Sequence, residues 1–466
     1  MASAAITTSS SEPRTLYWPL GLRETLGLGD INKTLSNFPQ TATHIKFHPD
    51  SADYETRRTT RICQGGLKQD VPAGWPTTVS GPLVWEGSNF HSDAEFVYHL
   101  SKSDKNEIRC ALKQVKEHDL SFDNIKEDTF PLPGLRCRLE EAREKIYNGL
   151  GFIVLRGLDV DEYSSRESLI IFLGVSSYLA AHKGAQDQAG NLLRQFITFQ
   201  TLKKHASLNS KITDHIVDYD RVDSDVDLPI HTDITADIVA TLPLKSSKSG
   251  GEAIVASAWT VYNELATTRP DLIHVLAEPD WPFDTYGRDP EYYNRALLFY
   301  HNEQILINFS RRVLTGHPIS PRTQGIPGLT EAQAEALDAV HFIAQKHKLT
   351  FSTEKGDMRF INNYAILHGR EAYSDDDIRI NLDKAERRSQ RHLLRLWLHN
   401  EKMAWKLPPS LRLVWARTFD EKRHRTWDAA QYMSQERVSS RGRSPSPSPP
   451  PPPRPGPRSP IPYPCD

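Results

Sequence analysis

Apolar residues recur with a helical period in three parts of the chain. Two of these parts begin with capping boxes, Ser164 with Glu167 and Thr330 with Gln333. The third ends near Gly149, a residue suited to the backbone turn that often closes a helix. Its apolar residues lie three or four positions apart: Leu135, Leu139, Ala142 and Ile146. We therefore predict one helix in each of these three places.

Short apolar runs between turn residues predict strands. The run 151–155 is almost uniformly apolar, as expected of a buried strand. Further strands are predicted at 194–200, 236–243, 252–257, 296–300, 304–309, 357–367 and 390–398. Many short strands, with helices mostly before them or inserted between them, predict a mainly β fold with flanking helices, arranged as a sandwich or barrel.

The two ends of the chain differ from its middle. Residues 1–90 contain many Pro, Gly and Thr and little apolar periodicity, so we predict an irregular extension. Residues 439–466 are rich in Arg, Ser and Pro, include five consecutive prolines, and cannot bury enough apolar surface to fold. We expect this tail to be disordered with polyproline II character. Residues 91–425 remain as the predicted folded domain.

Composition narrows the class of protein. The chain has 466 residues, 38% of them hydrophobic, and a net charge of -2, which gives no reason to expect a nucleic-acid partner. Its four cysteines are scattered without Cys-x-x-Cys spacing, which argues against a zinc site or disulfide framework and favours a reducing compartment. No apolar run approaches the ~20 residues of a membrane helix, and the first eleven residues do not resemble a signal peptide. We expect a cytoplasmic protein.

The His-x-Asp pattern occurs three times, and two of its occurrences are best explained as structural. His48-Pro49-Asp50 lies in an extended or turn segment imposed by proline, with no matching strand after it. His91-Ser92-Asp93 precedes an apolar stretch, and Ser92 with Glu95 has capping-box spacing, which places it at a helix start.

The third occurrence, His231-Thr232-Asp233, has strands around it. On a strand, residues two apart point to the same face, and a Gly250-Gly251 turn and a returning strand follow. His368 closes another strand-like run about 135 positions later. Two imidazoles and one carboxylate are the ligand set of a non-haem Fe(II) oxygenase. We predict that His231, Asp233 and His368 hold the metal.

Two arginines on the last apolar run add to this picture. With the period of a strand, Arg391 and Arg395 share a face, and burying them is costly unless anions meet them. A guanidinium binds a carboxylate through two hydrogen bonds, so Arg391 is suited to the far carboxylate of a 2-oxoacid cosubstrate. The alternative is a helix that carries both arginines on a solvated face, and the spacing alone does not decide between the two.

Five short stretches of the chain carry a family resemblance. They are Leu228-Pro-Ile-His-Thr-Asp-Ile, Gly250-Gly-Glu-Ala, Val261-Tyr-Asn-Glu-Leu, Asn362-Asn363 with Leu367-His-Gly-Arg370, and Arg391-His-Leu-Leu-Arg-Leu-Trp-Leu. As a set they resemble the TauD/TfdA-like Fe(II)/2-oxoglutarate dioxygenases, in particular the fungal branch, over about residues 90 to 420. The resemblance implies a double-stranded β-helix (jelly roll) core.

The resemblance also implies roles for single residues. His231, Asp233 and His368 match the iron ligands, Arg391 matches the arginine that grips the distal carboxylate of 2-oxoglutarate, and Arg395 matches a following arginine near cosubstrate or substrate. Family members often carry a Thr that binds the same carboxylate, and we align Ala258 with it. Either cosubstrate affinity is lower here or the neighbouring Ser257 takes this role.

A second departure from the family is the long segment between His368 and Arg391. Its residues 375–388 include acidic and basic clusters. We interpret them as a solvated surface loop, with a lid over the site as the alternative.

These observations predict an oxygenase that uses Fe(II), 2-oxoglutarate and O2. It would couple oxidative decarboxylation of 2-oxoglutarate to hydroxylation, desaturation or cyclisation of a small metabolite. An inward-facing Arg395 favours an anionic group on that metabolite. One alternative is an inactive jelly-roll protein that binds a protein partner through its Pro-rich tail. Another is a non-oxidative enzyme that holds a different divalent metal at the same residues.

Overall fold

The structure is a computed structural model that describes residues 45–199, 227–247, 249–318, 320–374, 389–420 and 425–427. The chain divides into two units, 1–428 and 429–466, and all described residues belong to the first. The predicted tail, 439–466, and the predicted loop, 375–388, lie outside the described residues. Within the described ranges, no helix combines the length and the apolar character needed to cross a membrane.

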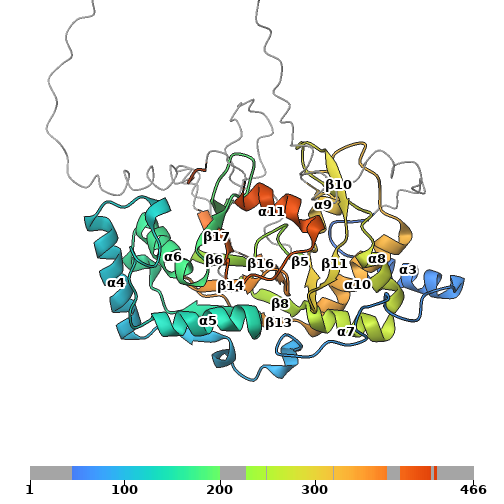
Figure 1. Ribbon diagram of the computed structural model, residues 1–466, viewed down its shortest axis with the longest axis horizontal. Helices are drawn as coiled ribbons and strands as arrows, with labels where there is room; N and C mark the ends of the chain where they lie inside the picture. The colour runs from blue at the N-terminus through green and yellow to red at the C-terminus, as the bar shows by residue number, and fades with distance from the viewer. Residues whose placement is uncertain are drawn as a thin grey trace, which may run out of the picture. The chain divides into compact units, whose positions relative to one another are not determined.

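Two sheets form the centre of the first unit (Figure 1). The larger has the strand order β1–β2–β14–β6–β17–β3, with β4 also paired to β17. Its strands are β1 (Val97–His99), β2 (Phe152–Arg156), β3 (His182–Gly184), β4 (Leu193–Phe199), β6 (Ile238–Lys245), β14 (Met358–Asn362) and β17 (Ser389–His399). The smaller has the order β13–β8–β15–β5. Its strands are β5 (Leu228–His231), β8 (Ala253–Ser257), β13 (Leu349–Phe351) and β15 (Ile366–Arg370).

Three two-stranded pairs complete the strands of the described residues. They are β9 (Trp281–Asp284) with β10 (Tyr292–Arg295), β11 (Leu298–His301) with β12 (Gln304–Ile307), and β7 (Ser249–Gly250) with β16 (Tyr373–Ser374). The pair β1–β2 is parallel, whereas the other pairs of the two central sheets are antiparallel. In the described part of the chain the sheets do not close into one barrel.

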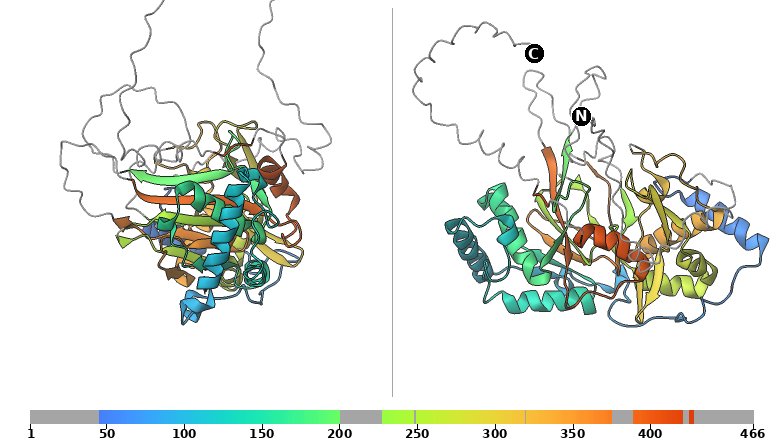
Figure 2. Two further views of the ribbon diagram at one scale, coloured as in Figure 1. Left: turned by 90° about the vertical axis from the view of Figure 1, so that its left-hand side faces the viewer. Right: turned by 45° about the horizontal axis from the view of Figure 1, so that its top comes forward.

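Helices cover both sides of the sheets (Figures 1 and 2). On the left in Figure 1 lie α4 (Lys102–Glu117), α5 (Arg136–Asn148) and α6 (Ser165–Leu179). On the right lie α3 (Ser51–Gln64), α7 (Ala258–Thr268), α8 (Pro270–Ala277) and α10 (Glu331–His347). The remaining α-helices are α9 (Arg312–Thr315) and α11 (Arg412–Phe419). Short 3-10 helices occupy Gly87–Asn89, Asp93–Glu95, Phe122–Asn124, Val160–Glu162 and Pro409–Leu411. The prediction of a sheet core with flanking helices is confirmed at this level.

The three predicted helices are confirmed as α5, α6 and α10. At the start of α6 the capping box forms, because Ser164 and Glu167 each accept a hydrogen bond from the other's backbone N–H, at 2.9 and 3.2 Å. Phe172 of α6 packs against Phe360 of β14, with ring centroids 6.4 Å apart. Since side chains alternate along a strand, the neighbouring Arg359 faces away from α6, towards the interior between the sheets.

Most predicted strands are confirmed with shifts of a few residues, but the run 357–367 is two strands. The chain leaves the larger sheet at the end of β14 and enters the smaller sheet as β15. The side chain of Asn362 accepts a hydrogen bond from the backbone N–H of Tyr364, at 3.1 Å, and thereby stabilises the turn between them. Apolar residues continue through this turn because it is buried, so the pattern shows no break.

The N-terminal extension was predicted to be irregular, and its described part contradicts this at α3. Asp50 caps this helix by accepting hydrogen bonds from the backbone of residues 52 and 53. The helix buries none of its residues, and Arg57 and Arg61 attach it to α10 through ion pairs with Asp338 and Glu335. An apolar pattern therefore could not indicate it.

The predicted helix start at Ser92 is also shorter than expected. Ser92 and Glu95 do form a capping box, but it opens only a 3-10 helix of 3 residues. The chain then continues as β1, because Val97–His99 pairs with β2.

Candidate metal centre

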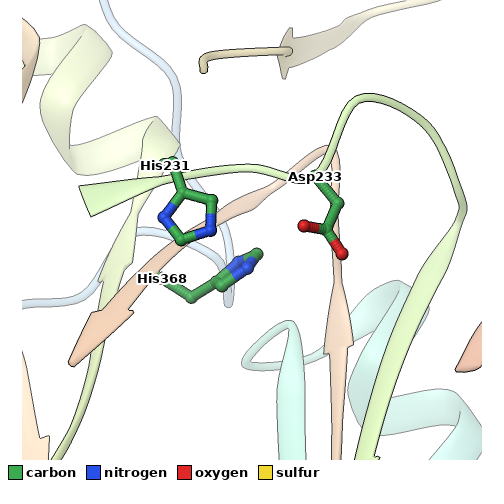
Figure 3. A group of neighbouring side chains, drawn as sticks. All are labelled: His231, Asp233 and His368. Atoms are coloured by element: carbon green, nitrogen blue, oxygen red, sulfur yellow. The ribbon is translucent and has the colours of Figure 1, made fainter. Parts of the chain in front are cut away.

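His231 and His368 lie on neighbouring strands of the smaller sheet. His231 ends β5, and His368, in the middle of β15, is its direct partner in the antiparallel register. Their ring centroids are 4.5 Å apart. Together with Asp233 they offer ligand atoms that all lie within 4.8 Å of one another, and Figure 3 shows the three side chains around a common space. In the described ranges this is the one cluster of three such groups.

Asp233 lies beyond the strand that carries His231, so the prediction that both share one strand is wrong. The chain leaves the sheet at Thr232, whose backbone N–H donates to the carbonyl of Phe309 at 2.6 Å. The backbone N–H of Asp233 donates to the side chain of Asn363 at 2.8 Å, and its carbonyl accepts from Asn308 and Asn363 at 3.1 and 3.0 Å. Asparagine side chains, rather than sheet pairing, fix Asp233.

The carboxylate of Asp233 is held in its ionised form. Arg395 donates from Nη1 to Oδ1 at 3.0 Å, and Trp397 donates from Nε1 to Oδ2 at 2.6 Å. Burial alone would raise the pKa of Asp233, but the positive charge of Arg395 and the hydrogen bond from Trp397 outweigh it, and the pKa is lowered. Each oxygen keeps a lone pair for a metal ion.

Both histidines are neutral at physiological pH. Burial lowers the pKa of His231, and burial together with the neighbouring imidazole of His231 holds the pKa of His368 well below its usual range. Nδ1 of His231 lies 2.8 Å from the carbonyl of Pro229, which makes Nδ1 the protonated nitrogen and leaves Nε2 for a ligand. Nδ1 of His368 is buried without a hydrogen-bond partner in the described part of the chain.

These properties fit a divalent metal ion. Two neutral imidazoles and one ionised carboxylate are the donor set of the 2-His-1-carboxylate centre, and this set favours Fe(II) when coordination positions stay open. The buried, unpaired nitrogen of His368 is costly without a partner.

The other two His-x-Asp pairs have structural roles, as predicted. Asp50 caps α3, and Asp93 lies at an exposed 3-10 turn, where it pairs with Arg156 at 3.4 Å.

A cavity of about 620 Å³ contains the cluster. Nine arginines line it, against three aspartates, so the wall carries an excess of positive charge. Arg391, Leu393, Arg395 and Trp397 all line it from β17, whereas the residues between them do not. This confirms the strand and excludes the alternative helix for this segment.

The two predicted cosubstrate arginines lie differently within the cavity. The guanidinium of Arg391 lies 5.6 Å from the ring centroid of Tyr373. Arg395 contacts Asp233, and its Nε donates to the side chain of Gln186 at 2.9 Å.

Ser257 is not among the residues that line the cavity. It is fully buried at the end of β8, where its hydroxyl accepts hydrogen bonds from the backbone of Trp259 and Thr260 and donates to the carbonyl of Leu83. Its hydroxyl therefore caps α7. Ala258, beside it, is buried as the first residue of that helix.

Several lining residues were not predicted from the sequence. Arg359 and Thr241 line the cavity from β14 and β6, and Trp397 lines it from β17. An arginine inside the apolar run 357–367 was the one available signal for Arg359. The sequence contained no signal for Asn308, which donates to the carbonyl of Asp233, because the two residues lie 75 positions apart.

Comparison with known proteins finds a matching family and similar proteins that cover most of the folded region. The model of the family described as "Taurine catabolism dioxygenase TauD, TfdA family" matches residues 116–397. The taurine hydroxylase-like protein SAT17 of Stachybotrys chartarum is 32% identical over 330 residues, 71% of this chain and 82% of that protein. FR-33289 synthase of Streptomyces rubellomurinus is 28% identical over 329 residues, 69% of this chain and 91% of that protein.

Solved structures also show similarity at low sequence identity. One is asparagine oxygenase in complex with Fe(II), 3-hydroxyasparagine and succinate, with a TM-score of 0.47 and 15% identity over 65% of this chain and 93% of that chain. Another is the non-haem iron oxygenase OrfP with Fe and alpha-ketoglutaric acid, with a TM-score of 0.44 and 16% identity over 66% of this chain and 94% of that chain.

Proposed function

This chain belongs to the taurine catabolism dioxygenase TauD, TfdA family, and from that premise we propose that it couples oxidative decarboxylation of 2-oxoglutarate to hydroxylation of a small anionic metabolite. Members of this family are 2-oxoglutarate-dependent dioxygenases. The chain is therefore an oxidoreductase that uses Fe(II), 2-oxoglutarate and O2. The observation that carries the proposal is the His231–Asp233–His368 cluster inside an arginine-rich cavity.

Each residue has a proposed task. His231, Asp233 and His368 hold Fe(II), which supplies the site for O2 activation. Arg391 binds the distal carboxylate of 2-oxoglutarate, because a guanidinium and a carboxylate match in geometry and charge. Arg395 orients Asp233 through the hydrogen bond at 3.0 Å.

The charge of the cavity supports an anionic substrate. Among the described residues that line the cavity, nine are arginines and three are aspartates, and a guanidinium pairs well with an anionic group. Hydroxylation is the proposed outcome, while desaturation and cyclisation use the same ligand set.

The same proposal includes a jelly-roll core formed by the two central sheets, within an oxygenase domain at residues 91–425.

The proposed location is the cytoplasm. The described cysteines, Cys63, Cys110 and Cys137, are free and exposed, which suits a reducing compartment.

Removal of a metal ligand tests the proposal. Purified Asp233→Ala and His231→Ala, supplied with Fe(II), 2-oxoglutarate and O2, are expected to form no succinate above background, because the metal loses one of three ligands. The matched control is His91→Ala, which alters an exposed His-x-Asp pair outside the cavity and should keep the wild-type rate. Succinate formation at the wild-type rate in either ligand variant contradicts the proposal.

A further inference from the structure

Arg359 has no counter-charge of its own in the wall of the cavity. Its Nε is buried without a hydrogen-bond partner. Within the described residues, its guanidinium makes no hydrogen bond or ion pair. A buried guanidinium without a partner is costly. Because Arg359 lines the cavity that contains the metal cluster, a ligand in that cavity is the natural source of the missing anion.

The register of the larger sheet places Arg359 in a row of polar residues. On three adjacent strands, Arg359 of β14 pairs with Thr241 of β6, and Thr241 pairs with Arg395 of β17. All three line the cavity. Directly paired side chains point to the same face of a sheet. Thr241, in the middle, is small, so the long side chains of Arg359 and Arg395 can reach over it. The hydroxyl of Thr241 makes no hydrogen bond among the described residues.

The guanidinium of Arg359 interacts electrostatically with both Arg391 and the metal cluster. Burial and, next, the positive charge of Arg391 lower the pKa of Arg359 to about 10. The negative charges of Asp357 and Asp233 act in the opposite direction. The charge of Arg359 also contributes to the lowered pKa of His231 and His368. Arg359, Arg391 and the cluster line one cavity, so an anion bound there can interact with both guanidinium groups.

We propose that Arg359 binds the distal carboxylate of 2-oxoglutarate together with Arg391, and that the hydroxyl of Thr241 assists them. This inference rests on the proposed function and adds residues to its cosubstrate site. One carboxylate placed between two guanidinium groups removes the repulsion between them and supplies the missing partner of Arg359. Thr241 would provide the hydroxyl that Ser257, occupied in capping α7, does not offer.

Ligand truncation tests the inference at the level of single groups. Protein loaded with Fe(II) in the absence of O2 is titrated with 2-oxoglutarate, and the metal-to-ligand charge-transfer absorption gives its Kd. The same titration uses 2-oxopentanoate, which has a methyl group in place of the distal carboxylate. The variants are Arg359→Leu, Arg359→Lys and Thr241→Val, with Arg312→Leu as a control that removes an arginine lining the cavity from α9.

Arg359→Leu is expected to raise the Kd for 2-oxoglutarate about 10- to 100-fold, the range for a lost hydrogen bond to a charged group. Its Kd for 2-oxopentanoate should change less than about 3-fold, which also shows an intact metal site. Arg359→Lys should fall between wild type and Arg359→Leu, because it keeps the charge but not the paired hydrogen bonds. Thr241→Val should raise the Kd for 2-oxoglutarate about 5-fold. Arg312→Leu should leave this Kd unchanged.

Three different outcomes would each contradict a different part of this account. An unchanged Kd for 2-oxoglutarate in Arg359→Leu removes Arg359 from the cosubstrate site and overturns the inference. An equal loss for both oxoacids shows that the effect is not at the distal carboxylate. The absence of any absorption band in the wild-type protein contradicts the proposed function itself, and the inference fails with it.

Discussion

Two groups of arginines in this protein meet opposite surroundings. Where α3, α8 and α10 meet, four arginines face three buried carboxylates: Arg57, Arg61, Arg269 and Arg311 with Asp271, Glu335 and Asp338. We call this group the ion-pair clamp. In the larger sheet, four arginines line the cavity, and one of them, Arg395, pairs with Asp233 of the metal cluster: Arg194, Arg359, Arg391 and Arg395. We call this group the sheet wall.

The difference separates stabilisation from binding. In the clamp each charge has a partner from the chain, so the clamp is complete without a ligand. In the sheet wall, Arg359 makes no hydrogen bond or ion pair with the described residues, so an anion that enters the cavity can supply its partner. Substitutions in the clamp should therefore change stability, and substitutions in the sheet wall should change ligand affinity.

The largest expected effect on stability is at Glu335, the most central carboxylate of the clamp. Glu335 is fully buried and pairs with both Arg61 and Arg269. Glu335→Gln should lower the free energy of unfolding by about 3–5 kcal/mol, because Arg61 and Arg269 would then share the single carboxylate of Asp271. Denaturant unfolding followed by fluorescence measures this loss, and the Kd of the folded variant for 2-oxoglutarate should equal that of wild type.

The matched variant in the sheet wall is Arg359→Leu. It removes a buried charge that has no partner in the described part of the chain, so its free energy of unfolding should equal or exceed that of wild type. If Arg359→Leu destabilises the protein as much as Glu335→Gln does, the distinction between the two groups fails.

A smaller effect is expected in acid from a buried histidine that interacts with Arg311 of the clamp. Burial, and then the charges of Arg311 and Lys348, lower the pKa of His341 on α10 from 6.5 to about 3. Between these pH values the unfolded chain binds a proton that the folded protein does not, so stability falls as pH falls below 6.5. From pH 7 to pH 5 the loss is about 2 kcal/mol.

The variant His341→Leu isolates this contribution. Its free energy of unfolding should fall by about 2 kcal/mol less than that of wild type over the same pH interval. Equal pH dependence in the two proteins would show that His341 is protonated to the same extent in both states.

The sequence predicted the metal ligands and the arginines of β17 better than the residues that support them. His231 and His368 were found because the residue types themselves suit a metal and because strands surround them. Arg391 and Arg395 were assigned from the family resemblance, since the spacing left strand and helix open, and the cavity lining now shows the strand. These signals are local, since each depends on a short stretch of the chain.

What the sequence could not provide depends on partners far along the chain. Asp233 is fixed by Asn308 and Asn363, and Arg359 acquires its neighbours only through the register of three strands. Helix α3 was missed because it buries none of its residues: ion pairs and the stacking of Tyr54 on Phe342 attach it to α10. Ser257 was assigned by its neighbourhood to Ala258, whereas its hydroxyl is already used as a helix cap.

The central claim is that the His231–Asp233–His368 cluster holds Fe(II) while Arg391 anchors 2-oxoglutarate beside it. Anaerobic titration of the Fe(II)-loaded protein with 2-oxoglutarate, in wild type and in Arg391→Leu, tests both parts in one measurement. The account predicts a charge-transfer band that saturates in wild type, and a Kd raised about 10- to 100-fold in Arg391→Leu. No band in wild type, or the same Kd in both proteins, would contradict it.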